Sequence, residues 1–278
     1  MDKKLFNTTK YLRIVIQIVF FIMMPSAFSS AFAAVKEAAV AISQGGELGF
    51  TPFAKIFLFL LAFTMICGRF FCGYACAFGS LGNWIYMISQ FIQKKVGKKL
   101  PSIPSRTARY LQLIKYVVLL AIVILCFAGF SGMVSESSPW TVCSLLINGK
   151  LPTEAMIVGA VILLLILVGM AFRQRFFCQF LCPLGAIFSL LPILPTGRMV
   201  RKSEGCIKGC NLCERKCPMD LKLGENEWRE GECIQCRICS YGCPKSSISL
   251  GMIPRGYGDI VWTVIEAAIL MAVLKFVI

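Results

Sequence analysis

The chain has 278 residues, of which 57% are hydrophobic and only 15% are charged. Its mean hydropathy of +0.74 is too high for a soluble domain and indicates a polytopic α-helical membrane protein. Fifteen cysteines occur with no histidine, which excludes bis-histidine haem, Rieske-type centres and histidine-ligated zinc or copper. The net charge of +15 raises nucleic-acid binding as an alternative, but the basic residues flank apolar segments, where topology and anionic lipid account for them.

Five apolar segments follow one another along the chain, and each is a candidate membrane helix. Four are long enough, or nearly so, to cross a bilayer: residues 11–33, 52–67, 111–130 and 154–172. The second of these needs tilt or local thinning of the bilayer. The last segment, 260–278, contains Glu266, whose charge is costly in lipid unless it faces protein. The sequence therefore predicts four or five transmembrane helices.

Basic residues are concentrated on one side of these segments. They cluster before the first segment, between the second and third, and after the fourth: Lys3, Lys4, Lys10, Arg13, Lys94, Lys95, Lys98, Lys99, Arg106, Arg109, Arg173, Arg175, Arg198, Arg201 and Lys202. The alternate loops carry only Lys36 and Lys150. The positive-inside rule then places the N-terminus, the 68–110 loop and residues 173–258 on the cytoplasmic side. We expect a multi-pass protein of the cytoplasmic (inner) membrane of a prokaryote.

A two-helix unit occurs twice. The stretch "KYLRIV" opens the first segment and "RYLQLI" opens the third, while "RFFCGYACAFGS" follows the second and "RFFCQFLCPLGA" follows the fourth. With two spans per unit, both cysteine motifs lie on the same side of the membrane. This repeat requires the first segment to be retained, although its Ala-x-Ala exit also resembles that of a secretory signal.

The repeat sets the expected domain limits. One membrane repeat covers 1–98 and the second covers 99–195, and in each the cysteine motif is followed by a short amphipathic helix that can lie in the interface plane. Prolines and a glycine then mark the exit into a cytoplasmic insert at 196–258. Residues 259–278 form the last helix.

The insert carries two runs of four cysteines, each ending in Cys-Pro. The second run, C-x2-C-x2-C-x3-C-P, has the spacing of bacterial 2[4Fe–4S] ferredoxins, in which the fourth cysteine ligates the other cluster. We therefore assign one cluster to four ligands: Cys206, Cys210, Cys213 and Cys243. The other cluster is assigned to the remaining four: Cys233, Cys236, Cys239 and Cys217.

Two alternatives to iron–sulfur clusters fit this spacing less well. Zinc also accepts four thiolates, but zinc ribbons pair two C-x2-C knuckles across a spacer instead of placing four cysteines in one run. Disulfides are disfavoured on the cytoplasmic side, where thiols stay reduced. The first run contains one extra residue, and Gly209 can absorb it without side-chain strain.

The two membrane motifs each carry a pair of cysteines: Cys72 with Cys76, and Cys178 with Cys182. Spaced i, i+4, the members of a pair share one face of a helix. A pseudo-twofold arrangement would bring four thiolates together, enough for an iron–sulfur cluster or a tetrahedral metal. The alternatives are buried small hydrophobes, redox-active dithiols or interhelix disulfides. The four cysteines form a candidate third redox or metal site.

Other residues near the motifs have expected roles. Arg69 and Arg175 are expected to anchor the topology and can lower the pKa of nearby thiols. Tyr74, Tyr86 and Glu136 are candidate quinone or proton contacts. The cysteines without a partner pattern are expected in the core or in loops: Cys67, Cys126 and Cys143.

On these motifs the chain resembles the membrane polyferredoxins with paired CxxxC(P) motifs. The resemblance is carried by "CGYAC", "CQFLCPLGA", "CERKCPMDL" and "ECIQCRICSYGCP", and it extends to about residue 255. Similar proteins include the H-type quinol dehydrogenase subunit of periplasmic nitrate reductase systems, the nitrous-oxide-reductase maturation regulators and the cytochrome-oxidase copper-assembly ferredoxins. Length and motif order are most similar to the first, although Cys76 is not followed by proline.

The resemblance implies electron transfer between the quinone pool, or a cytoplasmic donor, and an extracytoplasmic flavoprotein, cytochrome or iron–sulfur partner. We expect a lipid-embedded electron-transfer subunit with two [4Fe–4S] clusters, not a stand-alone enzyme. A second hypothesis is redox-linked handling or maturation of a metal such as copper by the membrane cysteines. A third, a redox sensor, lacks an attached DNA-binding or signalling domain. The chain carries no P-loop and no dinucleotide-binding glycine fingerprint.

Overall fold

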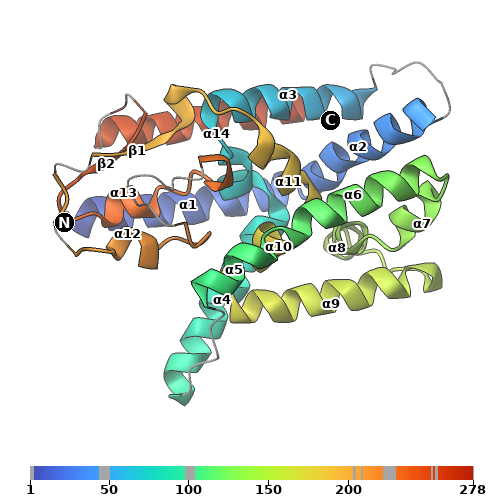
Figure 1. The fold of residues 1–278 in the computed structure, drawn as a ribbon, viewed down its shortest axis with the longest axis horizontal. Helices are drawn as coiled ribbons and strands as arrows, with labels where there is room; N and C mark the ends of the chain where they lie inside the picture. Colours follow the sequence, from blue (N-terminus) through green and yellow to red (C-terminus); the bar gives the residue numbers. More distant parts are fainter. Residues whose placement is uncertain are drawn as a thin grey trace.

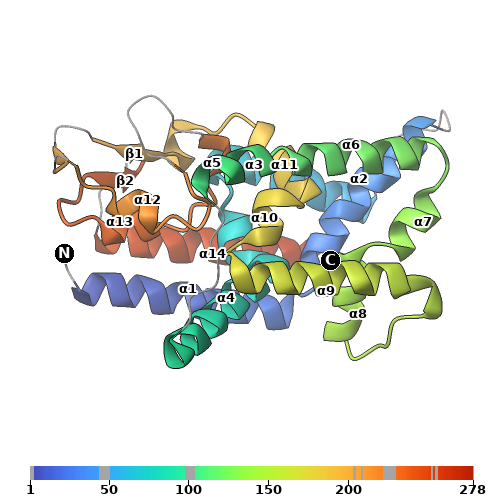
Figure 2. The same ribbon diagram turned by 60° about the horizontal axis from the view of Figure 1, so that its bottom comes forward.

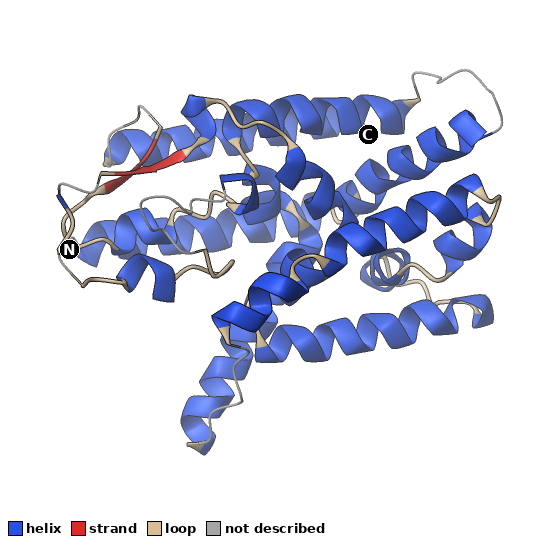
Figure 3. Ribbon diagram, in the orientation of Figure 1, coloured by secondary structure: helices blue, strands red, loops and turns tan. Residues whose placement is uncertain are grey.

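The computed structural model describes residues 3–43, 51–97, 104–202, 205–207, 209–221, 230–251, 253 and 256–277, and most of them are helical (Figure 3). The helices of the two repeats are α1 (Lys3–Met23), α2 (Ala27–Ser43), α3 (Pro52–Cys67), η1 (Phe71–Ala75), α4 (Ala77–Val96), α5 (Ser105–Leu111), α6 (Ile114–Phe127), α7 (Ser131–Glu136), α8 (Pro139–Ile147), η2 (Glu154–Met156), α9 (Ile157–Phe172), α10 (Phe176–Phe180) and α11 (Pro183–Leu190). The remaining elements are η3 (Pro195–Gly197), β1 (Met199–Arg201), α12 (Leu212–Arg215), η5 (Glu230–Glu232), α13 (Ile238–Gly242), β2 (Ile248–Leu250) and α14 (Tyr257–Val277).

The elements are arranged in two parts along the long axis of the molecule. The insert, with α12, α13 and the antiparallel pair β1–β2, lies at one end, flanked by α1 and α14 (Figures 1 and 2). Helices α2, α3, α6 and α9 extend toward the other end. The cysteine-motif elements η1, α10 and α11 lie where the two parts meet.

The first expected span is divided into two helices. Residues 11–33 were predicted as one helix, but α1 ends at Met23 and α2 begins at Ala27. Pro25 lies between them, and proline cannot donate the backbone hydrogen bond that a continuous helix needs and clashes with the preceding turn. The boundary of the first span was therefore wrong.

The other expected spans differ less from the sequence prediction. The segment 111–130 is shortened to α6, because a turn at Gln112 and Leu113 separates it from α5. The segment 52–67 matches α3, which begins at Pro52 after Thr51, whose hydroxyl accepts a hydrogen bond from the Ala54 amide at 3.2 Å. The segment 154–172 matches η2 and α9.

Two helices in the described part of the chain are long and apolar enough to cross a bilayer. They comprise Leu5–Met23 in α1 and Glu154–Phe172, which combines η2 and α9. The helices α3 and α6 are apolar but shorter. By length and composition, the described helices therefore include two candidate membrane spans, and the predicted number of four or five is not established.

Helix α14 is fixed to the insert by buried charges. The Arg237 guanidinium lies 2.8 Å from Oδ1 of Asp259 and 2.5 Å from Oε2 of Glu266, and all three side chains are buried. Glu266 therefore faces protein, as its cost in lipid required. Since removing one partner of a buried ion pair leaves an uncompensated charge, this pairing ties the last helix firmly to the second cysteine run.

The amphipathic helix of the first repeat packs on the second repeat. Helix α4, which follows the first cysteine motif, packs on α9, whereas α11 of the second repeat packs on α6 of the same repeat. The Ser89 hydroxyl of α4 donates to the Ala171 carbonyl at 2.8 Å. Only the distal half of α4 leaves its apolar side chains exposed, Ile88 and Ile92 among them. The helix expected to lie in the interface is therefore half packed against protein.

The first cysteine motif approaches the insert most closely at Gly73. A Cβ atom on Gly73 would lie only 2.3 Å from the Ile234 carbonyl oxygen, a distance that real Cβ atoms do not adopt. The Gln17 amide also donates to the Gly73 carbonyl at 3.0 Å. Any side chain at this position must therefore displace the loop that carries the second cysteine run.

We expect Gly73→Ala to destabilise the protein by about 1–3 kcal/mol, because the added methyl group overpacks this contact. The measurement is the Tm of thermal unfolding in detergent, compared with wild type. Gly132→Ala is the matched control, since a Cβ there meets nothing within 4 Å. An unchanged Tm for Gly73→Ala would contradict the close approach.

Candidate metal centres

The first cavity in the insert is lined by four cysteine side chains. They are Cys217, Cys233, Cys236 and Cys239, and Met219, Leu221 and Ile234 close the apolar side of the same cavity. The loop that carries three of these cysteines takes left-handed backbone conformations at Gln235 (φ 54°) and Arg237 (φ 57°). These two turns wrap the chain around the cavity.

Backbone amides lie close to three of these sulfurs. The amides of Gln235, Ser240 and Met219 favour the charged forms of Cys233, Cys239 and Cys217, in that order. Burial, reinforced by the neighbouring Cys236, raises the pKa of the Cys233 thiol to about 12. Four thiols around one cavity, three of them beside backbone amides, fit a cationic iron core, which would supply the charge that stabilises the thiolates.

The second cavity is lined by the other four cysteines of the insert: Cys206, Cys210, Cys213 and Cys243. All four are partly exposed. Gly209, the extra residue of the first run, has φ +74° with open space around it, a conformation that glycine adopts without strain. The Arg201 guanidinium donates to the Cys206 sulfur at 3.3 Å.

Each cavity thus takes three cysteines from one run and the fourth from the other run. Two contacts bring the runs together: α12 packs on α13, and the Ser240 hydroxyl donates to the Ile248 carbonyl at 2.8 Å. Four sulfurs around a cavity form the donor set of a [4Fe–4S] cluster, whose chemistry when bound is one-electron transfer.

The four membrane-motif cysteines lie together in the core between the repeats. Cys72 lies in η1 and Cys178 in α10, while Cys76 and Cys182 immediately precede α4 and α11. All four are buried, with 4–7% of each residue exposed. Cys182 is close enough to interact electrostatically with the other three, and no disulfide joins any of the chain's fifteen cysteines, all of which are described.

The two arginines that open these motifs cross over to the opposite repeat. A Cβ on Gly79 would lie 2.1 Å from Nη1 of Arg175, and a Cβ on Gly185 would lie 2.9 Å from Nη2 of Arg69. The arginine of each motif therefore occupies the space left by the trailing glycine of the other. This reciprocal contact is a local pseudo-twofold relation between the two motifs.

Both arginines are fully buried, which differs from the expectation that they anchor the topology at the membrane surface. Arg175 donates to the carbonyls of Cys72 (2.7 Å) and Gly73 (2.9 Å), and its Nε is buried without a hydrogen-bond partner. The charge of Arg69 interacts with the Cys72 thiol. Two buried cations thus lie beside four buried thiols, where positive charge offsets part of the cost of burying a thiolate.

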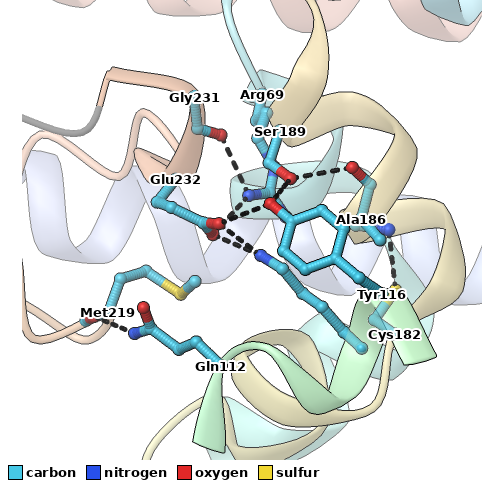
Figure 4. A network of polar contacts seen from close by, with 11 residues as sticks. Arg69, Gln112, Tyr116, Cys182, Ala186, Ser189, Met219, Gly231 and Glu232 are labelled. Atoms are coloured by element: carbon cyan, nitrogen blue, oxygen red, sulfur yellow. Dashed lines mark hydrogen bonds and ion pairs between the residues drawn. The ribbon is translucent and has the colours of Figure 1, made fainter. Parts of the chain in front are cut away.

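A carboxylate from the insert joins this cationic region. Glu232 accepts from Nζ of Lys115 at 2.5 Å, from Nη1 of Arg69 at 3.2 Å and from the Tyr116 hydroxyl at 3.3 Å (Figure 4). Burial raises the pKa of Glu232, but Arg69 and Lys115 outweigh it and lower that pKa below its ordinary value. Because Cys233 follows Glu232, the network ties the membrane motif to the first cavity.

Sequence reasoning missed Lys115 and Glu232. Two features of the sequence could have pointed to them. Lys115 lies at the start of an otherwise apolar helix, where a charge is costly unless it is paired, and Glu232 is the acidic residue of "GECIQC". Nothing local identifies them as partners, because they lie 117 residues apart in the chain.

Tyr74 and Tyr86, predicted as quinone or proton contacts, both line one large cavity beside Cys236. Glu136 ends α7 and does not line it. The three cysteines without a pattern lie in the core, as expected: Cys67, Cys126 and Cys143.

The sequence matches a family profile described as "4Fe-4S binding domain" at residues 51–99 and 155–195. The two matched ranges contain the two membrane cysteine motifs, one in each repeat. The duplication is thus visible in the family comparison as well as in the chain.

Several known proteins are similar to this chain. Uncharacterized protein MJ0749 of Methanocaldococcus jannaschii is 31% identical over 76% of this chain and 75% of its own length. Protein NirI of Paracoccus denitrificans is 29% identical over 61% of this chain and 24% of its own. YccM of Escherichia coli, whose name describes an electron transport protein, is 27% identical over 70% of this chain and 55% of its own.

No solved structure matches the chain. The names of two relatives describe an electron transport protein (YccM) and a regulatory protein (NosR of Pseudomonas aeruginosa), and the matched family profile is described as a 4Fe–4S binding domain. With its duplicated cysteine motifs and iron–sulfur donor sets, the chain belongs to the polyferredoxin family with paired CxxxC(P) motifs.

Proposed function

We propose that this protein is a membrane-bound electron carrier that passes single electrons between a quinol pool, or a cytoplasmic donor, and an extracytoplasmic redox partner. The observation that carries the proposal is the pair of insert cavities, each lined by four cysteines drawn from both runs. Cubane clusters accept and release one electron at a time, and their potential depends on the amide hydrogen bonds and burial around the sulfurs.

In this proposal the two cubanes occupy unequal surroundings. The cavity of Cys233, Cys236, Cys239 and Cys217 lies against the membrane motifs through Gly73 and Glu232. The cavity of Cys206, Cys210, Cys213 and Cys243 lies toward the exposed end of the insert. Electrons would therefore enter or leave the membrane part through the first and reach a soluble partner through the second.

A multi-pass membrane location is also part of the proposal. Helices α1, α6, α9 and α14 each expose apolar side chains, such as Ile22, Val117, Leu165 and Ile269. Contiguous exposed apolar surface on several helices is typical of lipid contact. The basic N-terminus and the basic insert would then face the cytoplasm.

The membrane-motif cysteines support a third redox site in the same carrier. Four buried thiols and two buried arginines form a donor set for an iron–sulfur cluster, and the matched family profile covers these motifs. The same four thiols also favour a second candidate function, redox-linked binding or maturation of a metal such as copper, since soft thiolates select Cu(I).

The cluster assignments predict which cysteine variants behave alike. In anaerobically purified protein, Cys236→Ser and Cys217→Ser should perturb the same cluster, and Cys210→Ser and Cys243→Ser the other, each by loss of about four iron atoms. Iron, acid-labile sulfide and EPR of the reduced protein measure this outcome. Cys143→Ser, in the core, should keep the full content. If Cys217→Ser instead altered the EPR signal that Cys210→Ser alters, the crossed ligation would be wrong.

A third cluster at the membrane-motif cysteines predicts a loss of iron that is separate from that of the two insert clusters. Replacing Cys72, Cys76, Cys178 and Cys182 by Ser should lower iron from about twelve to about eight atoms while both insert clusters remain. The control is Cys67→Ser/Cys143→Ser, which removes buried thiols outside the site. Unchanged iron with loss of bound copper would instead support the metal-handling function, and no change in either metal would remove both.

If a quinol pool is the electron donor, quinol should reduce the clusters directly. Menaquinol or ubiquinol added without oxygen should bleach the visible absorbance of the clusters and produce the EPR signal that dithionite produces. If dithionite reduces the clusters and neither quinol does, a cytoplasmic donor replaces the quinol pool in the proposal.

A further inference from the structure

A large cavity lies beside Cys236, apart from the two cavities that are each lined by four cysteines. It has a volume of about 460 Å³, within the range that holds small organic ligands. Its walls come from α1, α4, α13 and α14 and from the loop that carries Cys236. It therefore lies against the ligand set of the first insert cavity.

Arg13 lies in the wall of this cavity with unused donors. The residue is 6% exposed, and its Nε and Nη2 are buried without a hydrogen-bond partner. Its guanidinium carbon lies 6.0 Å from the centre of the Tyr74 ring, and the charge interacts with Cys236. Buried donors without partners are costly, so an oxygen acceptor from a ligand would complete this site.

A second polar group lies in the same wall. The Tyr241 hydroxyl lines the cavity and donates to Oδ2 of Asp259 at 2.5 Å. Asp259 is held in turn by Arg237. This chain of contacts fixes the side chain of Tyr241 in the wall, and because its proton goes to Asp259, the hydroxyl oxygen can only accept a hydrogen bond, such as one from the O–H of a quinol.

The rest of the wall combines aromatic and apolar side chains with polar ones, among them Asn83, Gln90 and Gln174. Phe6, Ile14 and Tyr86 line the cavity, and Met87 and Phe91 of α4 lie at its mouth with 40% and 60% of each residue exposed. Neighbouring α1 exposes Val15 as well. These aromatic and apolar side chains can pack on a ring, while the polar groups of the wall can bind the oxygen atoms of the ligand.

We propose that this cavity binds the ring of a quinone or quinol, with Arg13 donating to a ring oxygen on the side of Cys236. The inference rests on the proposed function, because it gives the quinol pool its entry point. Oxidation of one quinol to quinone releases two electrons and two protons. Two one-electron clusters in the insert balance the electrons, and the protons pass to water.

A phospholipid headgroup is the competing occupant. Lys10 and Lys94 also line the cavity, but both are exposed, and their charges are already solvated. Only Arg13 offers cationic donors at depth, and it shares the wall with aromatic rings and a cluster cysteine. A single buried arginine can satisfy a ring carbonyl oxygen, whereas the several charged oxygens of a buried phosphate need more partners than Arg13 provides.

The test uses the whole protein in nanodiscs with a photoreactive azidoquinone, and mass spectrometry locates the labelled peptides. Label is expected on α1, α4 and the Cys236 loop, and excess menaquinone should compete it away. Arg13→Gln should weaken binding about tenfold to a hundredfold, the effect of losing one charged hydrogen bond. Cys236→Ser should still bind quinone, which separates binding from electron transfer.

Met87→Trp is a second variant, which blocks the mouth of the cavity from an exposed position and does not disturb the core. Its matched control is Ile88→Trp, on the adjacent, more exposed side chain that does not line the cavity. We expect Met87→Trp to lose labelling with unchanged iron content, and Ile88→Trp to keep both. Arg215→Gln controls for the loss of an arginine charge.

The outcomes separate this site from the proposed function. If quinol reduces the clusters equally in wild type, Arg13→Gln and Met87→Trp, the quinol arm stands and this site is wrong. Label outside the cavity, or phospholipid found in it in place of quinone, would also overturn the site. If quinol reduces no cluster in wild type but azidoquinone still labels the cavity, the quinol arm of the proposed function fails while the binding site stands.

Discussion

The structure depends on how buried positive charge is balanced where the two repeats and the insert meet. Arg69, Arg175, Lys115 and Arg237 are all buried there. Unpaired, each would cost several kcal/mol in an apolar interior. Three carboxylates, Glu232, Asp259 and Glu266, compensate part of this charge, and four thiols lie beside the rest. The membrane cysteines and the first insert cavity are therefore tied to the same electrostatic centre.

This balance explains why the repeats are interlocked. Each motif arginine needs the space that only a glycine of the other motif provides, so neither repeat completes its own cysteine site. The packing of α4 on α9 adds a further contact between the repeats. Duplication of a two-helix unit has produced one shared site from two halves, which neither half contains alone.

The same centre orders the proposed route of electrons. The large cavity, the first insert cavity and the membrane cysteines all meet near Gly73, Glu232 and Cys236, whereas the second insert cavity lies farther out. Short separations between redox groups favour single-electron transfer, and rigid buried ion pairs keep those separations constant. The insert is thus held against the membrane helices at its cluster loop and again through α14.

The sequence by itself determined the helical class, the duplicated motif and the iron–sulfur chemistry, because hydropathy, repetition and cysteine spacing are local properties of the chain. It also led to the expectation that Glu266 faces protein. Only the tertiary structure decided where α1 ends, because the break at Pro25 lies inside an apolar run that periodicity reads as one helix. Only the tertiary structure showed that Lys115 pairs with Glu232, and that Arg69 and Arg175 each lie against a glycine of the other motif. These partners are about a hundred residues apart in the chain and meet only when the repeats and the insert pack together.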